Sequence, residues 1–341
     1  MDATPRVAIY GAGQFGNLAA RIATEKGYPV VAAYNRAGAK VGKDLGRLAG
    51  LDRDLGVIVQ DCETADYSAE PADVGIVALS DRLHEAMPAY LRLMEAGTNV
   101  ICHAVEASFP WGANPGLAAE IDAAAKANGV SFLGTSLWDM SRIWSGILVA
   151  GPCTEIRALH HTTHTAIEGA GKALMLWCGV GMTPDEFEER MVHDGGRMSG
   201  LYRLAPWHVL HALGYTVTNV TERREPIIWD EPVYCRPLQE EIPPGIAVGL
   251  RIRADLETAE GVTAHATVEL RVFRKGEKEH MIWEVDGMPS SKIRVDRGRD
   301  GVWASSSSMV NRIPDVIAAE PGIRLMSELG PLRHSALPGP R

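Results

Sequence analysis

The stretch that decides the fold is Arg6-Val7-Ala8-Ile9-Tyr10-Gly11-Ala12-Gly13-Gln14-Phe15-Gly16, in which a GxGxxG motif directly follows a short apolar run. Residues 17–26 then have the pattern of a helix. In such a strand–turn–helix unit the first glycine permits a tight turn, the second lets the backbone approach a pyrophosphate, and the third lets helix and strand pack closely. The helix N-terminus adds unpaired N–H groups and the positive end of its dipole. The motif alone is weak, but this context predicts a dinucleotide-binding site.

Further short apolar runs follow this motif, separated by stretches with helical periodicity. The runs are 30–34, 56–60, 74–79, 99–102 and 130–133, and the clearest helical stretches are 83–97 and 117–128. Apolar strands that alternate with helices are typical of a parallel sheet covered on both faces. We therefore predict an α/β fold with a Rossmann NADP-binding domain over residues 1–136.

The pattern changes after residue 136. Thr183-Pro184-Asp185-Glu186 is a helix start, with an N-cap threonine, an early proline and a glutamate three residues on. Residues 250–257 and 264–272 alternate apolar and polar side chains, which is typical of antiparallel strands with one wet face. Residues 309–329 have a helical pattern up to Pro321. We predict an α+β substrate and dimerisation domain over 137–300 and a C-terminal segment, 301–341, that returns to the Rossmann domain.

Composition limits the class of protein. The chain has 341 residues, which suggests two domains at roughly 150 residues each. Its net charge is -9, so the chain lacks the overall positive charge that is typical of a nucleic-acid binder. No apolar run approaches the roughly 18 residues that a membrane helix needs. The five cysteines are widely spaced without a CxxC pair, and the N-terminus has no export-signal pattern. These features predict a cytoplasmic protein with reduced thiols.

The residues after the second predicted strand select the cofactor. NAD enzymes usually place Asp or Glu there to accept a hydrogen bond from the ribose 2′-hydroxyl, whereas this chain has Asn35-Arg36, with Lys40 and Lys43 nearby. Arg36 can hold a 2′-phosphate with paired N–H donors. We expect NADP(H) as cofactor, with NAD(H) also accepted because Asn35 can bond a hydroxyl. The alternative is that Arg36 is a solvated loop cation.

Ligands of open parallel sheets bind outside the carboxyl ends of the strands. Two such ends are Leu79-Ser80-Asp81 and His103-Ala104-Val105-Glu106. A carboxylate such as Glu106, placed beside apolar and prolyl residues, can be partly desolvated and exchange protons. Position alone leaves both a surface and a catalytic glutamate open. We expect cofactor contacts at Gly11, Gly13, Gln14, Phe15, Gly16, Asn35, Arg36, Leu79, Ser80 and His103.

Three segments carry a resemblance to a known family. They are Glu106-Ala107-Ser108-Phe109-Pro110-Trp111, Asn114-Pro115-Gly116-Leu117 and Val310-Asn311-Arg312-Ile313-Pro314-Asp315-Val316-Ile317. In sequence and order they resemble the 2,4-diaminopentanoate dehydrogenase family and its relatives, the native NAD(P)-dependent amine dehydrogenases, within the dihydrodipicolinate reductase fold group. The resemblance extends from the glycine motif to about residue 323.

This resemblance implies roles for individual residues. It implies that Glu106 is the catalytic carboxylate and that Asn311 contacts the cofactor. A carboxylate suits reductive amination, because a base can take a proton from ammonium and later return one as water leaves. The iminium then accepts hydride from the nicotinamide, and the reverse reaction oxidises an amine. The resemblance also implies a homodimer formed through the antiparallel sheet.

Two departures from related enzymes bear on the substrate. Dihydrodipicolinate reductases carry a His-His-x-x-Lys motif, and the similar segment of this chain is His160-His161-Thr162-Thr163-His164. In the loop that follows, Glu168 would repel an acidic substrate. Diaminopentanoate dehydrogenases have a GTGxNPGF-like motif after the sixth strand, whereas residues 134–144 of this chain contain bulky aromatic side chains. These side chains favour a small apolar pocket. We expect pocket-lining side chains at Trp138, Met140, Trp144, Thr163, His164 and Trp177. For Trp138, Met140, Trp144 and Trp177 core packing is the alternative.

The three histidines also admit a metal-site interpretation. On a helix, His160 and His164 would share one face, but residues 154–159 and the threonines favour a strand. Four residues of strand span roughly 13 Å, too far for one ion. We therefore expect no metal, with one or two of these histidines in the substrate pocket or, as the alternative, a histidine satisfied within the sheet.

The leading hypothesis is an NADP(H)-dependent amine dehydrogenase. Its reaction would be the reversible amination of small apolar ketones or aldehydes by ammonia to primary amines. A 2,4-diaminopentanoate-type dehydrogenase acting on an amino acid is the first alternative. The second is a non-catalytic NADP-binding sensor with the same fold. No nucleic acid or membrane partner is expected.

Overall fold

The computed structural model describes residues 4–170, 172–298 and 300–334, and the chain divides into two compact units. The chain up to residue 140 and from residue 301 onward forms the first unit, and residues 141–300 form the second. The first unit therefore reaches residue 140, where the sequence placed the boundary at 136, and it includes the C-terminal segment. Residues 335–341 of that segment lie outside the described residues.

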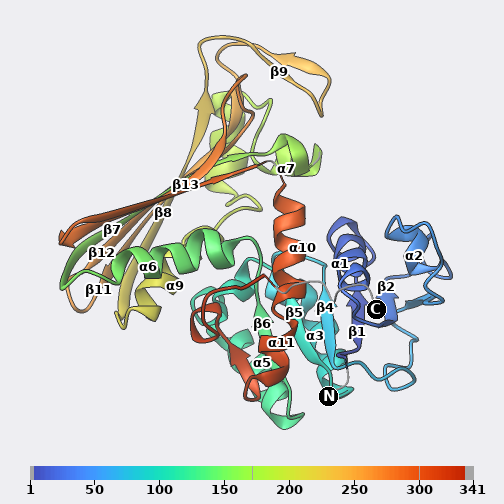
Figure 1. The fold of residues 1–341 in the computed structure, drawn as a ribbon. Helices are drawn as coiled ribbons and strands as arrows, with labels where there is room; N and C mark the ends of the chain where they lie inside the picture. The colour runs from blue at the N-terminus through green and yellow to red at the C-terminus, as the bar shows by residue number, and fades with distance from the viewer. Residues whose placement is uncertain (1–3, 171, 299, 335–341) are drawn as a thin grey trace. The chain divides into compact units, whose positions relative to one another are not determined.

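The first unit is built on a parallel sheet with the order β15-β6-β5-β4-β1-β2-β3 (Figure 1). Its strands are β1 (Val7–Tyr10), β2 (Val30–Asn35), β3 (Val59–Asp61), β4 (Val74–Val77), β5 (Asn99–Cys102), β6 (Ser131–Gly134) and β15 (Gly322–Arg324). Its helices are α1 (Gln14–Glu25), α2 (Leu45–Leu48), α3 (Leu83–Glu95), η1 (Glu106–Ser108), α4 (Pro110–Ala113), α5 (Pro115–Ala127), α10 (Gly301–Asn311), α11 (Ile313–Ala318) and η5 (Met326–Glu328). The β1 and β4 side chains are buried throughout, as expected for strands covered on both faces.

The C-terminal segment completes this unit. α10 lies beside α1 (Figure 1), where Ser306 Oγ donates a hydrogen bond to the Phe15 carbonyl at 3.2 Å. α11 packs on β4, β5 and β6, and β15 adds an edge strand parallel to β6. The predicted helix at 309–329 is wrong in its bounds, because helix begins at Gly301 and is divided before Pro314. A proline lacks the N–H of a helix interior and therefore favours a helix start.

A buried ion pair fixes the C-terminal segment to Asp139, which follows β6 in the chain. Arg312 Nε and Nη2 donate to the two Asp139 carboxylate oxygens at 2.8 Å each, and both side chains are fully buried. The remaining Arg312 donors bond Asp315 at 2.7 Å and the carbonyls of Leu329 and Gly330. Because every donor has an acceptor, the cost of burying the cation is compensated.

The second unit contains a six-stranded mixed sheet with the order β14-β13-β7-β12-β11-β8 (Figure 1). The π-helical turn η2 (Asp139–Trp144) leads into it. Its strands are β7 (Glu155–Ala166), β8 (Val217–Ile228), β11 (Ala247–Thr258), β12 (Thr263–Arg271), β13 (Glu279–Met288) and β14 (Ser291–Arg297), with a separate pair of β9 (Val233–Cys235) and β10 (Glu240–Ile242). Its helices are α6 (Ser145–Ala150), η3 (Glu168–Ala170), α7 (Lys172–Trp177), α8 (Pro184–Phe187), η4 (Glu188–His193) and α9 (Leu204–Ala212).

The two faces of this sheet differ, as the alternating pattern predicted. In β11 the residues Leu250, Ile252, Ala254 and Leu256 are buried, and α6 packs on β13 and β14. The opposite face carries paired charges, including Arg251 with Glu269 at 2.8 Å and Arg253 with Glu225 at 3.2 Å. The sheet is antiparallel except for the β7–β12 pair, which is parallel. The capping box predicted at Thr183 is confirmed at the start of α8.

Two smaller findings complete the description. All five cysteines are free thiols, four of them buried. Within the described ranges no helix combines the length and apolar character that crossing a bilayer requires.

We expect Arg312→Met to destabilise the protein strongly, by about 3–5 kcal/mol, because it leaves the buried Asp139 carboxylate without its cation. Thermal and urea unfolding measure the loss. The exposed α1 pair between Arg21 and Glu25 supplies the control, since Arg21→Met should cost at most about 1 kcal/mol. Similar losses in both variants would contradict the role assigned to Arg312.

Candidate active site

The glycine loop between β1 and α1 has the geometry of a dinucleotide cradle. Gly11 has a φ of +101°, and a Cβ there would lie 2.4 Å from the Ala78 carbonyl oxygen. A Cβ on Gly16 would lie 1.9 Å from the Gly11 carbonyl oxygen, so both positions require glycine. By contrast, no atom lies within 4 Å of a Cβ placed on Gly13. Gly11 and Gly16 therefore serve the close packing, and Gly13 leaves space above the loop.

In the described part of the chain, no side chain caps the N-terminus of α1. Its cap residue, Gly13, supplies no side-chain acceptor, and the first turn contains no acidic side chain. Gln14 is exposed and Phe15 is half-buried. A helix end of this kind fits a pyrophosphate, whose charge the N–H groups and the helix dipole stabilise.

Asn35 and Arg36 lie at the end of β2, next to this loop. Asn35 Oδ1 accepts a hydrogen bond from the Ala12 N–H at 3.1 Å, so this amide ties β2 to the glycine loop. Arg36 is exposed, and its side chain has no ion-pair partner among the described residues. Its guanidinium is therefore available to an anionic ligand.

The ends of β4 and β5 meet the glycine loop. Leu79 Cδ2 lies 3.0 Å from a Cβ built on Gly11, and the rings of Phe15 and His103 are 4.4 Å apart. Ser80 Oγ donates a hydrogen bond to Glu85. Burial lowers the pKa of His103, so this ring is neutral at pH 7. The structure thus brings these predicted cofactor residues to one edge of the sheet.

Glu106 stands at the same edge and is held through both carboxylate oxygens. Oε1 accepts from Arg82 Nη1 at 2.7 Å, and Oε2 accepts from the Leu83 N–H, at the start of α3, at 2.8 Å. The Glu106 N–H donates to the Asp81 carbonyl at 3.1 Å. The Glu106 side chain is 14% exposed, so it is neither sealed in nor turned into bulk solvent.

Close backbone contact fixes the height of the Glu106 turn above the sheet. A Cβ on Gly134, the last residue of β6, would lie 2.0 Å from the Ala107 carbonyl oxygen. Any larger residue would push η1, and Glu106 with it, away from the sheet. This role of Gly134 was not predicted from the sequence, and neither was Arg82, whose one signal is its place in the loop between β4 and α3.

Asn311, the last cofactor residue predicted, ends α10 and is half-buried. The predicted pocket residues are divided between the units: Trp138 and Met140 belong to the first, and Trp144, Thr163, His164 and Trp177 to the second. Trp138 is buried, whereas Met140 is 46% exposed. Trp144 is half-buried at the end of η2, and the Trp177 ring lies 4.8 Å from the Arg197 guanidinium.

Thr163 and His164 cannot line one pocket together, because successive strand residues point to opposite faces. Thr163 is fully buried and bonds His161 Nε2 at 2.9 Å, whereas His164 lies on the charged face near Glu269. The predicted strand at the HHxxH segment is confirmed as β7. His160 also lies on the charged face, so the three histidines do not converge. Within the described residues no three His, Cys, Asp or Glu side chains gather as metal ligands.

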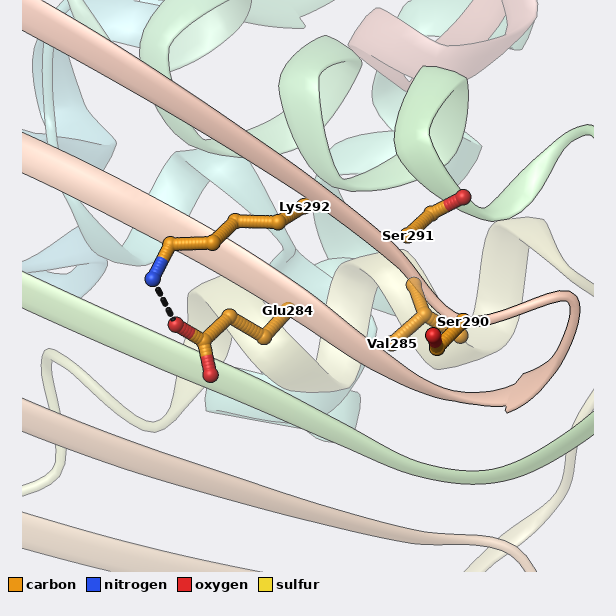
Figure 2. A pocket seen from close by; sticks show the side chains of 5 residues that line it. All are labelled: Glu284, Val285, Ser290, Ser291 and Lys292. Atoms are coloured by element: carbon orange, nitrogen blue, oxygen red, sulfur yellow. Dashed lines mark ion pairs between the residues drawn. The ribbon is translucent and has the colours of Figure 1, made fainter.

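One shallow hollow of about 340 Å³ lies on the β13–β14 hairpin. It is lined by Glu284, Val285, Ser290, Ser291 and Lys292, and Figure 2 shows the Lys292 ammonium directed at the Glu284 carboxylate. None of the predicted site residues lines it. This hollow is therefore a surface feature apart from the candidate site.

Comparison with known proteins decides the family. The sequence model of the 2,4-diaminopentanoate dehydrogenase C-terminal domain matches residues 146–337, more than half of the chain. The chain belongs to this family. The match confirms the predicted resemblance and the enzyme class, an NAD(P)-dependent oxidoreductase acting on CH–NH2 groups. It also agrees with the predicted fold class, a Rossmann-type α/β domain with a second, mostly antiparallel sheet.

Full-length relatives agree with this assignment. The 2,4-diaminopentanoate dehydrogenase of Acetoanaerobium sticklandii is 26% identical over 340 residues, covering 95% of this chain and 93% of that protein. The structure of the amine dehydrogenase from Mycobacterium smegmatis matches with a TM-score of 0.86 at 29% identity, covering 98% of both chains. Biliverdin reductase from Synechocystis sp. PCC 6803, solved with biliverdin and NADP+, has a TM-score of 0.52 at 15% identity over 90% of each chain, and so shows the fold alone.

The buried His161 of this dehydrogenase should make its stability depend on pH. Burial lowers the pKa of His161 well below its usual value, whereas the unfolded chain binds the proton below about pH 6.5. Stability is therefore lost as pH falls through that value. When the pH is lowered from 7.5 to 5.5, we expect the free energy of unfolding of the native protein to fall by about 1.4 kcal/mol more than that of His161→Gln. Urea unfolding measures both losses, and equal losses would contradict the assignment.

Proposed function

We propose that the protein is an NADP(H)-dependent amine dehydrogenase that aminates small apolar ketones or aldehydes with ammonia, reversibly, to primary amines. The observation that carries the proposal is the Glu106 carboxylate, held by two donors at the edge where the β4 and β5 ends meet the glycine loop. The family supports amine chemistry. The structural similarity to the Mycobacterium smegmatis amine dehydrogenase supports the choice of a simple amine.

The residues present fit a dinucleotide. The glycine loop and the open N-terminus of α1 would hold the pyrophosphate, and Arg36 would hold a 2′-phosphate. Phe15 and His103, whose rings lie 4.4 Å apart and are tilted by 31°, would flank the site. When bound, the reduced nicotinamide supplies the hydride.

Glu106 would handle the protons of the reaction. A carboxylate offers about four acceptor positions, and Arg82 and Leu83 occupy two of them in this structure. The remaining positions can hold ammonium and take its proton, which frees the nitrogen lone pair for attack on the carbonyl carbon. The nitrogen of the adduct would pass a second proton to the carbonyl oxygen, and Glu106 would return its own proton to the resulting hydroxyl, which leaves as water. Ketone, ammonium and hydride then balance neutral amine and water, and one proton from solvent converts the product to its ammonium form.

One alternative substrate class has support of its own. The match to the C-terminal domain of 2,4-diaminopentanoate dehydrogenase, and the full-length similarity to that enzyme, favour an amino-acid substrate. A matched panel of ketones, each with and without a carboxylate, separates the two classes. A strong preference for the carboxylate-bearing member of each pair would replace the simple-amine proposal.

Glu106→Gln should lower ammonia-dependent NADPH oxidation about 10²–10⁴-fold, because an amide cannot exchange the proton. Steady-state kinetics with a small ketone measures the rate, and fluorescence titration should show that NADPH still binds. Glu95→Gln, an exposed substitution in α3, is the matched control and should keep full activity. Full activity in the Glu106 variant would remove the carboxylate from its proposed role.

Arg36→Ala should raise the Kd for NADPH roughly 10- to 100-fold and leave that for NADH nearly unchanged, since a bond to a charged phosphate contributes about 1.5–3 kcal/mol. Binding titrations with both cofactors measure the difference. Arg53→Ala, another exposed arginine of the first unit, should change neither. Equal losses for NADPH and NADH would contradict a phosphate contact.

A further inference from the structure

Arg82 and Glu106 form an ion pair that links two loops of the first unit. Arg82 directly precedes α3, and Glu106 begins η1 after β5. Their side chains are mostly buried, at 21% and 14% exposure, and the Nη1–Oε1 distance is 2.7 Å. A pair so shielded from solvent interacts more strongly than a surface pair, and its geometry is fixed by both loops.

The second Glu106 oxygen is anchored independently of Arg82. Oε2 accepts from the Leu83 N–H, the first N–H group of α3, so the carboxylate also closes the N-terminus of that helix. The cap residue of α3, Arg82, forms no capping bond with its own side chain. Loss of Arg82 would therefore remove the positive charge beside Glu106, while the Leu83 N–H would still hold the carboxylate at the helix.

The charged groups around Glu106 come from several elements. Asp81 lies on the β4 loop, where its carboxylate accepts from the Val105 N–H at 3.4 Å. Glu85 lies in the first turn of α3 and bonds Ser80. From deeper in α3, the buried Tyr90 interacts with Glu106, and Cys102 and His103 end β5 and start the next loop. Among these groups Arg82 carries the positive charge, and its guanidinium is bonded to Glu106.

We propose that Arg82 is a positioning residue for the reaction: it holds a positive charge 2.7 Å from Glu106 Oε1 and fixes the carboxylate, so that its remaining acceptor positions stay open to the amine nitrogen. This inference rests on the proposed role of Glu106. Burial penalises a charged carboxylate, whereas a guanidinium at 2.7 Å favours it. Without the cation, the carboxylate would lose this stabilisation.

The test compares pH profiles of kcat/KM for ammonia-dependent NADPH oxidation in native protein, Arg82→Met and Arg82→Lys. The acid limb reports the base of the free enzyme, and substrate ionisation is the same for every variant. In Arg82→Met we expect this limb to move to higher pH by roughly 1–2 units, because the opposing cation is gone. Arg82→Lys keeps the charge, so its limb should stay at the native position.

The control removes a second arginine–glutamate ion pair, one that involves α3 and has a more exposed carboxylate. Arg92 in α3 pairs with Glu63 at 2.7 Å, away from Glu106, and Arg92→Met should leave the acid limb unmoved. Melting curves and NADPH binding establish that each variant folds. If Arg82→Met does not fold, Arg82→Gln replaces it, because glutamine can still donate to Oε1 without carrying charge, and the same shift is expected.

The possible outcomes distinguish failure of the Arg82 inference from failure of the proposed function. An acid limb at the native position in the uncharged Arg82 variants would overturn the inference, whatever their loss of rate, and would assign the pair a structural role alone. Full activity of Glu106→Gln in the same assay would instead overturn the proposed function, and the Arg82 inference with it. A shifted limb in the uncharged variants, restored by lysine, supports both.

Discussion

The buried pair between Arg312 and Asp139 is the contact on which the first unit depends. It fastens the C-terminal segment to the chain just beyond β6, and that attachment lets β15 join the sheet and α10 lie beside α1. Through Ser306, α10 then supports the carbonyl of Phe15 at the start of α1. The glycine loop is thereby braced by residues from the far end of the sequence. Fully bonded donors make this buried charge tolerable, and the loss of either partner would leave the other unpaired.

Two helix N-termini at the same sheet edge have opposite uses. The α1 N-terminus has no capping side chain and no acidic residue in its first turn, so its N–H groups can bind the negative charge of a ligand. The α3 N-terminus is closed by the Glu106 carboxylate of the protein itself. One helix end therefore fits a phosphate, and the other fixes a carboxylate within the same group of loops. The neutral His103 ring against Phe15 adds no charge between them.

The sequence predicted the elements whose signals are local. The glycine motif, the buried strands and the alternation in β11 and β12 are confirmed, because each depends on residues close together in the chain. The sequence patterns gave wrong element boundaries where tertiary contacts determine the local structure. The third strand begins at Val59 rather than residue 56, because Asp44 accepts the N–H groups of Leu55 and Gly56 and holds them in a loop. The serine-rich start of α10 has weak helix propensity and becomes helical beside α1.

The sequence by itself determined the dinucleotide motif, the acidic residue after β5 and the family resemblance, since all three are patterns of residue type at short spacing. Only the tertiary structure decided what holds Glu106, because its partners Arg82 and Leu83 lie 24 and 23 residues away in sequence. It also decided that Thr163 and His164 face opposite sides of β7 and that Gly134 must be glycine. Such facts follow from which backbones come into contact, and no local pattern of residues encodes that.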